Sequence, residues 1–175
     1  MKTVIKGELS VEGIKDIQRQ LEEYKKTFNN KTQLFAERLA LEGVNIARMK
    51  ITSLDAIFTG ELLQSIRREP KEITTSSAKF AIITDSEHAC FVEFGTGQKG
   101  LDTPYPYPLP NGVSWNYAVG TTIKQNPITG HYYWFYPGKD GKWHYTEGMP
   151  ARPFMYETSL ELNKIIDRVA REVFS

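Results

Sequence analysis

Apolar side chains near the start of the chain recur at helical spacing. Between residues 10 and 28 they are separated by steps of three and four, which places them on one face of a helix that Ser10 can cap. These positions are Ile14, Ile17, Leu21, Tyr24 and Phe28. After Asn29-Asn30 we expect a break, and then a second helix to about Thr52 with apolar residues on more than one face. The pattern predicts a helical N-terminal part, residues 1–52.

The pattern changes to β-branched and aromatic residues between Ala78 and Phe94. Residues 80–84 and 89–94 are typical of strands, and the polar residues 85–87 between them suit a turn, so we expect a β-hairpin. Cys90 lies in the second of these strands. A buried small side chain is a better interpretation of this cysteine than a reactive nucleophile.

The last part of the chain predicts an amphipathic helix with Pro153 at its first position. Its apolar face consists of Leu162, Ile165, Ile166, Val169, Ala170 and Val173. Together with the predicted strands, this helix indicates an α+β fold. We expect N-terminal helices, an antiparallel sheet of about four strands, and the C-terminal helix packed on that sheet.

Residues 95–150 differ from the rest of the chain in composition. They hold seven of the nine prolines, nine of the 13 glycines and 11 of the 21 aromatic residues, which predicts a large elaborated loop. Prolines at every second place in residues 105–110 favour an extended path. Aromatic residues 131–136 and residues 142–145 flank a Pro-Gly-Lys-Asp-Gly turn, which predicts a hairpin within the loop.

Length and charge narrow the class of protein. A chain of 175 residues fits a single domain, residues 1–175. Its 22 Lys and Arg against 21 Asp and Glu give a net charge of +1, which favours neither a membrane nor sequence-specific nucleic acid as a partner. One cysteine excludes a disulfide-stapled secreted scaffold, and the sequence has no apolar leader. We expect a chain made and kept in the cytoplasm unless a larger assembly carries it out.

Candidate catalytic and metal-binding residues do not form a recognisable pattern. His88, His131 and His144 could join Glu93 or Glu147 in a zinc site, but no pair has the spacing that fixes two ligands on one helical face. Residues 95–97, Gly-Thr-Gly, lack the third glycine and the following helix of a phosphate-binding loop and suit a turn. The sequence predicts no enzyme, no metal and no cofactor.

The aromatic hairpin is the main candidate binding surface. Alternate residues of its strands are expected to divide between a small satellite core and a protein neighbour, because Tyr and Trp are enriched at protein interfaces. The candidate contact residues are Tyr132, Trp134, Tyr136, Trp143 and Tyr145. The alternative is a small carbohydrate-binding module that stacks sugars on the hairpin 131–145.

Three short segments occur in an order that matches a known family. They are Thr59-Gly60-Glu61-Leu62-Leu63-Gln64-Ser65-Ile66, Phe91-Val92-Glu93-Phe94-Gly95-Thr96-Gly97 and Gly148-Met149-Pro150-Ala151-Arg152-Pro153-Phe154-Met155. In this order the chain resembles the head-tail joining, or tail-completion, proteins at the neck of long-tailed bacteriophages. It departs from that pattern in lacking prolines before Thr59 and at Glu157, and in its large insertion, residues 98–149.

The motif residues have physical roles that do not depend on the family. Gly60 permits a turn, and Leu62 and Ile66 anchor a short helical turn. Glu93 is an acid near the end of an apolar strand, and we expect it to pair with Arg152.

At the last helix, Pro150 and Pro153 are expected to fix the approach of the chain, and Phe154 to enter the core. All the motif residues can hold the fold or contact a partner, and the sequence leaves both roles open. They are Thr59, Gly60, Leu62, Ser65, Glu93, Phe94, Gly95, Thr96, Pro150, Arg152, Pro153 and Phe154.

The resemblance implies a structural, non-enzymatic protein of a virion or prophage. Such a protein would assemble in the host cytoplasm as a ring, with six copies expected, between connector and tail tube. Its partners would be copies of itself and neighbouring neck, connector or tail-tube proteins. We expect the loop 95–150 to contact the neighbouring subunit or the next ring.

Overall fold

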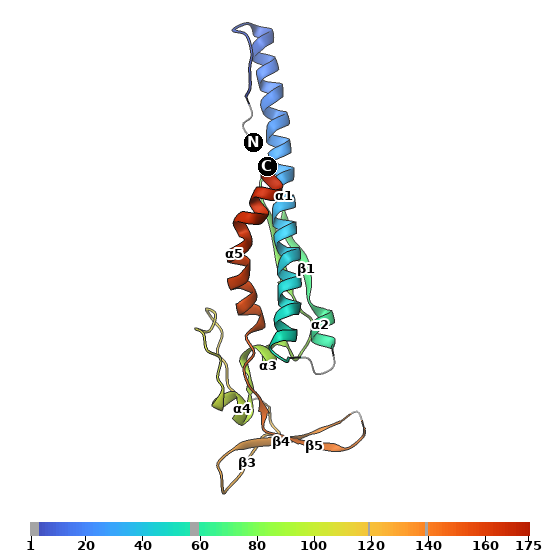
Figure 1. The fold of residues 1–175 in the computed structure, drawn as a ribbon, viewed down its shortest axis with the longest axis vertical. Helices are drawn as coiled ribbons and strands as arrows, with labels where there is room; N and C mark the ends of the chain where they lie inside the picture. The colour runs from blue at the N-terminus through green and yellow to red at the C-terminus, as the bar shows by residue number, and fades with distance from the viewer. Residues whose placement is uncertain (1–3, 57–59, 119, 139) are drawn as a thin grey trace. The chain divides into compact units, whose positions relative to one another are not determined.

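The computed structural model describes residues 4–56, 60–118, 120–138 and 140–175, and its architecture confirms the α+β class (Figure 1). The helices are α1 (Val11–Ser53), α2 (Glu61–Ser65), α3 (Ala89–Phe94), α4 (Gly97–Asp102) and α5 (Phe154–Phe174). The strands are β1 (Arg67–Ile73), β2 (Ala78–Ile83), β3 (Lys124–Gln125), β4 (Tyr132–Pro137), β5 (Trp143–Thr146) and β6 (Gly148–Met149).

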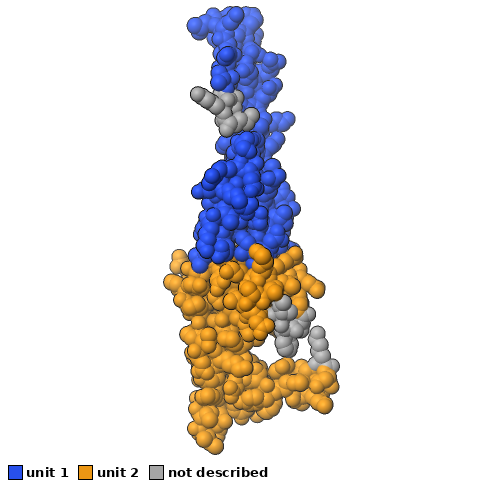
Figure 2. Space-filling model, in the orientation of Figure 1, with its two compact units in different colours: residues 1–46, 67–83, 159–175 blue, residues 47–66, 84–158 orange. Residues whose placement is uncertain are grey.

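The chain divides into two compact units (Figure 2). The first contains residues 1–46, 67–83 and 159–175, and the second contains residues 47–66 and 84–158. Strands β1 and β2 belong to the first unit, and the other strands belong to the second. None of the described helices combines the length and the apolar character needed to cross a membrane.

Helix α1 begins as the sequence predicts. The Ser10 hydroxyl accepts a hydrogen bond from the Gly13 backbone N–H at 3.0 Å, so Ser10 caps the helix. The predicted break at Asn29-Asn30 is wrong, because one helix runs through it. Asparagine disfavours a helix by less than about 1 kcal/mol per residue relative to alanine, which packing can outweigh.

The packing that outweighs the Asn pair comes from α5. Phe28 and Phe35 lie on either side of the pair, and both rings contact Phe174, with centroids 5.7 and 6.0 Å apart. Residues seven apart share one face of a helix. The C-terminal helix therefore contacts α1 on both sides of the Asn pair, which favours one continuous helix.

Helices α1 and α5 share a core with β2 in the first unit. Gly43 of α1 lies against Ile82 of β2 and leaves no room for a Cβ, and that Cβ would also lie 3.1 Å from Leu162 of α5. Arg168 of α5 pairs with Glu42 of α1 at 3.4 Å. Glycine at position 43 permits this close approach of helix and strand.

Within the described residues the strands form two small sheets, β1-β2 and β3-β4-β5, and not one sheet of four strands. β2 lies in the region predicted to be a strand, but its partner is the charged segment β1. Residues 89–94 form the helix α3, so the predicted hairpin is wrong. A short apolar run does not distinguish a strand from a helix by periodicity alone.

Burial along α3 gives the physical reason for the helix. Ala89, Val92 and Glu93 are buried, and their steps of three and one are typical of a helical face. Cys90 lies between them and is exposed, so the expectation of a buried cysteine is also wrong.

The hairpin predicted within the loop is confirmed. β4 and β5 are antiparallel, with Phe135 opposite Tyr145 and Pro137 opposite Trp143. β3 extends this sheet on the other side of β4. β6 pairs only through bridges, in which Met149 lies opposite Thr96 and Gly148 opposite Gly97.

Candidate functional site

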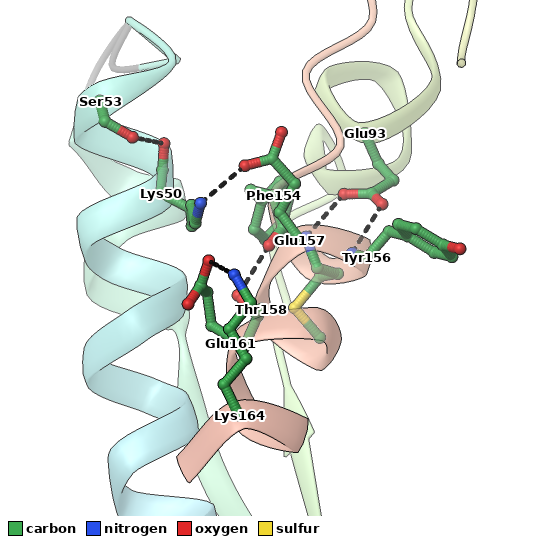
Figure 3. Close-up of polar contacts among 10 residues, drawn as sticks. Lys50, Ser53, Glu93, Phe154, Tyr156, Glu157, Thr158, Glu161 and Lys164 are labelled. Carbon is green, nitrogen blue, oxygen red and sulfur yellow. Dashed lines mark hydrogen bonds and ion pairs between the residues drawn. The ribbon is translucent and has the colours of Figure 1, made fainter. Parts of the chain in front are cut away.

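Glu93 of α3 caps the start of α5 in the second unit (Figure 3). Its carboxylate accepts hydrogen bonds from the backbone N–H groups of Met155 at 2.9 Å and Tyr156 at 3.1 Å. The first N–H groups of a helix have no partner within the helix, and they carry the positive end of its dipole. An acid that is only 7% exposed is thus matched to donors that need an acceptor.

Burial and hydrogen bonding act on Glu93 in opposite directions. Burial raises the pKa of its carboxyl, the two backbone N–H donors lower it, and the nearby Glu157 carboxylate raises it, with a net increase. Glu157 in turn pairs with Lys50 of α1 at 2.9 Å, as Figure 3 shows. The start of α5 is therefore connected to α3 and to the end of α1.

Arg152 connects the same segments through different atoms. Its side-chain Nε donates to the backbone carbonyl of Leu54 at 2.8 Å, and its backbone N–H donates to the carbonyl of Val92 at 2.8 Å. The predicted ion pair between Glu93 and Arg152 is not formed. The Glu93 carboxylate accepts hydrogen bonds from N–H groups at the start of α5, where the helix dipole is positive. The Arg152 guanidinium donates to a carbonyl just after the end of α1, where the helix dipole is negative.

The chain enters α5 through a tightly packed turn. The Pro153 carbonyl accepts the hydrogen bond from Glu157 N–H at 2.9 Å, so Pro153 stands just before the first helical residue, Phe154. Phe154 is fully buried. Pro150 lies directly after β6.

The Gly-Thr-Gly segment after α3 lies against the same turn. Gly95 has φ +80°, and a Cβ there would lie 2.7 Å from the Ala151 backbone nitrogen. Thr96 is buried, and its hydroxyl has no hydrogen-bond partner among the described residues. The helix α4 follows this segment, contrary to the expectation of a simple turn.

The segment around Gly60 lies elsewhere in the second unit, and Thr59 is outside the described residues. Gly60 has φ +77°, as expected for a turn that favours glycine. Leu62 of α2 and the following Ile66 are buried. The Ser65 hydroxyl donates to the Leu62 carbonyl at 2.9 Å and lies 2.6 Å from the Thr84 hydroxyl.

An aromatic cluster covers α3 and the start of α5. Phe94 lies between Tyr105 and Trp115, with ring centroids 4.9 and 5.1 Å away, and Tyr107 stacks on Tyr156 at 4.0 Å. Burial, together with the Glu93 charge, raises the pKa of Tyr105 to about 12. Trp115 Nε1 donates to the Gly95 carbonyl at 2.8 Å. The proline-rich part of the loop therefore builds a satellite core.

The β4–β5 hairpin has two unlike faces. Phe135, Trp143 and Tyr145 lie on one face and are 47, 70 and 53% exposed. Tyr133 shares that face and stacks on Tyr145 at 5.5 Å. We call these four residues, of which Tyr133 is partly buried, the exposed aromatic face. Only part of this face was expected from the sequence, because Tyr133 and Phe135 were not among the candidate contact residues. Alternation along the strand places both of them on the same face as each other and could have identified them.

The other face of the hairpin carries Tyr132, Trp134 and Tyr136, which are partly buried. A Cβ on Gly97 would lie 2.7 Å from the Trp134 ring, so Trp134 packs against the start of α4. Tyr136 stacks on His144, the residue opposite it. The five contact residues expected from the sequence are thus divided between the two faces.

The three histidines do not come together in one site. His144 Nε2 lies 2.9 Å from an Asp140 carboxylate oxygen, and this contact lowers the pKa of Asp140. His131 precedes β4 and is not paired with His144 across the hairpin. Among residues 4–56, 60–118, 120–138 and 140–175, no group of three or more His, Cys, Asp or Glu could hold a metal ion.

One family model matches the chain. Its description is "Bacteriophage HK97-gp10, putative tail-component", and the match covers residues 15–95. The matched segment runs from α1 through α3 and includes the first two motif segments, apart from the last two residues of the second. No curated protein and no solved structure matches the chain.

Proposed function

We propose that this chain, whose residues 15–95 match the model of the HK97-gp10-like family of bacteriophage tail components, is a non-enzymatic protein that joins head and tail at the neck of a virion. It would form a ring, with six copies expected, between connector and tail tube. Its partners would be copies of itself and neighbouring neck, connector or tail-tube proteins. The observation that supports this proposal is the exposed aromatic face, together with the match of residues 15–95 to a family of tail components.

Ring formation needs two different surfaces of one subunit to meet repeatedly around an axis. The exposed aromatic face is a suitable first surface, because Trp and Tyr rings supply much contact area with little loss of side-chain freedom. Trp143 is its most exposed ring. The second surface would be a different patch on the neighbouring subunit or on the next ring.

Deleting residues 131–145 tests whether the loop makes these contacts. A sharper test replaces only exposed rings, as Phe135→Ala with Trp143→Ala. We expect this double variant to keep its melting temperature within a few degrees and to lose assembly, measured by sedimentation velocity on the purified protein and by virion yield.

Trp134→Ala is the matched control for that experiment. Because Trp134 packs against Gly97, its removal is expected to lower the melting temperature, since burial stabilises the loop. Assembly that is unchanged in both the deletion and the double variant would overturn the assembly role of this face.

A carbohydrate-binding module is the second candidate, because an exposed row of rings also suits stacking on sugars. Glycan-array binding and calorimetric titration distinguish the two functions. Sugar binding by the wild type that is lost in Trp143→Ala, with assembly unaffected, would replace the neck function by this alternative.

A further inference from the structure

The two edges of the β1-β2 sheet are unlike. β1 has charged residues at five of its seven positions, and Pro70 lies at a register irregularity. Prolines, charges and bulges are features that prevent another strand from adding to a sheet edge. β2 has one charged residue, Lys79, among its six. The edge of β2 that faces away from β1 makes no hydrogen bond to any other described residue. This edge is therefore open to a further strand.

Residues 4–9, also in the first unit, are a segment whose backbone could pair with such an open edge. Residues 4–9 form neither helix nor strand, and we call them the N-terminal arm. Among the described residues, the arm makes one hydrogen bond, from Gln20 Nε2 to the Lys6 carbonyl at 3.2 Å. Val4 and Leu9 are exposed, and Gly7 lies beside Ile17 of α1. Most backbone groups of the arm make no hydrogen bond to the described residues, and its contacts with α1 are those of Lys6 with Gln20, Gly7 with Ile17 and Glu8 with Gly13.

The arm cannot reach β2 of its own chain. Gln33 of α1 donates to the Thr74 carbonyl at 3.1 Å, which places the turn between β1 and β2 beside residue 33. The arm joins α1 at residue 10, about 35 Å away along the helix at 1.5 Å per residue. Six extended residues span only about 20 Å. A strand formed by the arm on β2 must therefore come from another copy.

We propose that the N-terminal arm of one subunit adds as an antiparallel strand to the free edge of β2 in a neighbouring subunit. The six described residues of the arm are enough to pair along the six residues of β2. Backbone hydrogen bonds supply the attraction in this mode of recognition, and alternate side chains supply the specificity. The proposal deepens the proposed function, on which it rests for the existence of a self-assembled ring.

Charge and apolar pattern fix the direction of the added strand. With Glu8 opposite Lys79, an antiparallel arm places Val4 opposite Ile83 and the intervening Ile5 opposite Ile82. Opposite charges and apolar pairs directly across a sheet are stabilising. A parallel arm over the same residues would put Val4 beside Lys79 and Glu8 beside Ile83, which loses both matches.

Arm and edge are different surfaces of one subunit, so their pairing is a head-to-tail contact. Such contacts continue from copy to copy until a ring closes. The arm gives up one hydrogen bond and its packing on Ile17 and Gly13 in this exchange. Exchange of a weakly held segment between identical subunits is a low-cost route to assembly.

Disulfide trapping tests the contact. In a Cys90→Ser background, which removes the exposed native thiol, Val4→Cys and Ile83→Cys are introduced together. Directly opposite residues of antiparallel strands lie within disulfide range. We expect mild oxidation with glutathione to give a ladder of covalent oligomers on a non-reducing gel. The matched control, Val4→Cys with Lys79→Cys, should give at least tenfold less ladder.

The remaining outcomes separate this contact from the ring itself. Deletion of residues 1–9 is expected to lower the assembled mass in sedimentation velocity while the circular dichroism of the subunit is retained. An assembled protein that gives no ladder and is unaffected by the deletion overturns the arm contact and leaves the ring intact. A wild type that is monomeric at every concentration, with no ladder, overturns both.

Discussion

Glu93 illustrates how one buried acid can join two segments of a chain, here α3 and the start of α5. Its two hydrogen bonds to the start of α5 replace contacts that water would otherwise provide. Replacement by alanine removes both acceptors. We expect Glu93→Ala to lower the free energy of unfolding by about 1–2 kcal/mol, the range for losing a helix cap, measured by urea denaturation at neutral pH.

The pH dependence of stability gives a sharper test at this residue. Because the pKa of Glu93 is raised above its ordinary value of 4.5 in the folded state, protonation favours folding. The stabilisation is present below about pH 4.5 and is lost as pH rises through the raised value. Glu93→Gln resembles the protonated acid and does not titrate. We expect Glu93→Gln to gain stability relative to wild type between pH 4.5 and 7.

Urea denaturation of both proteins at pH 4, 5, 6 and 7 measures that difference. Carboxyls that are distant from Glu93 titrate alike in the two proteins and cancel in the comparison. A difference that stays constant, or that changes in favour of wild type as pH rises, would contradict the raised pKa.

Gly95 and Gly112 differ in what an added Cβ would meet. Both have φ +80°, but a Cβ on Gly95 would lie 2.7 Å from the Ala151 nitrogen, while nothing lies within 4 Å of one on Gly112. Alanine costs about 1–2 kcal/mol in the left-handed region, and Gly95, whose ψ is 164°, lies in a further region that is essentially restricted to glycine. We expect Gly95→Ala to lower the free energy of unfolding by at least about 1 kcal/mol more than Gly112→Ala. Equal losses in urea denaturation would show that the turn can relax.

At the scale of elements, α5 is held on α1 by aromatic packing near its C-terminus. The Phe174 ring contacts Phe28 and Phe35 together. Aromatic pairs contribute about 0.5–1.5 kcal/mol each beyond the area they bury. We expect Phe174→Ala to cost about 2 kcal/mol and to speed amide exchange in the last turns of α5. Hydrogen exchange detected by mass spectrometry measures both effects.

Ile166→Ala is the control on the same helix, because Ile166 is exposed and its loss should change stability by about 0.5 kcal/mol or less. If the amides in the last turns of α5 exchange at the same rate in the Phe174→Ala and Ile166→Ala variants, the Phe28–Phe174–Phe35 cluster does not hold α5 on α1. The continuous path of α1 past Asn29-Asn30 would then need another explanation.

At the scale of the whole molecule, charge is nearly balanced and much of it is paired within the chain. The net charge is +1, and pairs such as Arg68 with Glu37 and Arg168 with Glu42 join neighbouring elements. The proposed assembly through aromatic rings and backbone hydrogen bonds should then be only weakly sensitive to salt. We expect the assembled mass to be unchanged between about 0.1 and 0.5 M NaCl. Dissociation at the higher salt concentration, in sedimentation velocity, would indicate an interface built on charge.

The division of the aromatic hairpin matters at this scale as well. Trp134 and Tyr136 pack on one face and stabilise the loop, while Phe135 and Trp143 lie on the opposite face and are exposed to solvent. A chain that needed only a stable loop would have little use for the second set. This difference between the faces is the physical basis on which we propose that the exposed aromatic face makes contact with a partner.

The sequence by itself determined the elements whose signals are long or chemically specific. Periodicity over many residues identified the helical N-terminal part and the amphipathic α5, because a helical stripe must be buried whatever it packs against. Turn residues around Gly138 and Gly141 identified the β4–β5 hairpin for a similar local reason. The order of the motifs around Gly60, Glu93 and Arg152 identified the phage family that the family model matches in residues 15–95.

Only the tertiary structure decided the rest, because the competing local forms differ by little free energy. Residues 89–94 are a helix since burial of Val92 and Glu93 requires that spacing. α1 is continuous since Phe174 spans the Asn pair. Glu93 meets backbone N–H groups, and not Arg152, since the dipoles at a helix start and a helix end select opposite charges. Each of these outcomes depends on residues distant in sequence, which no local pattern records.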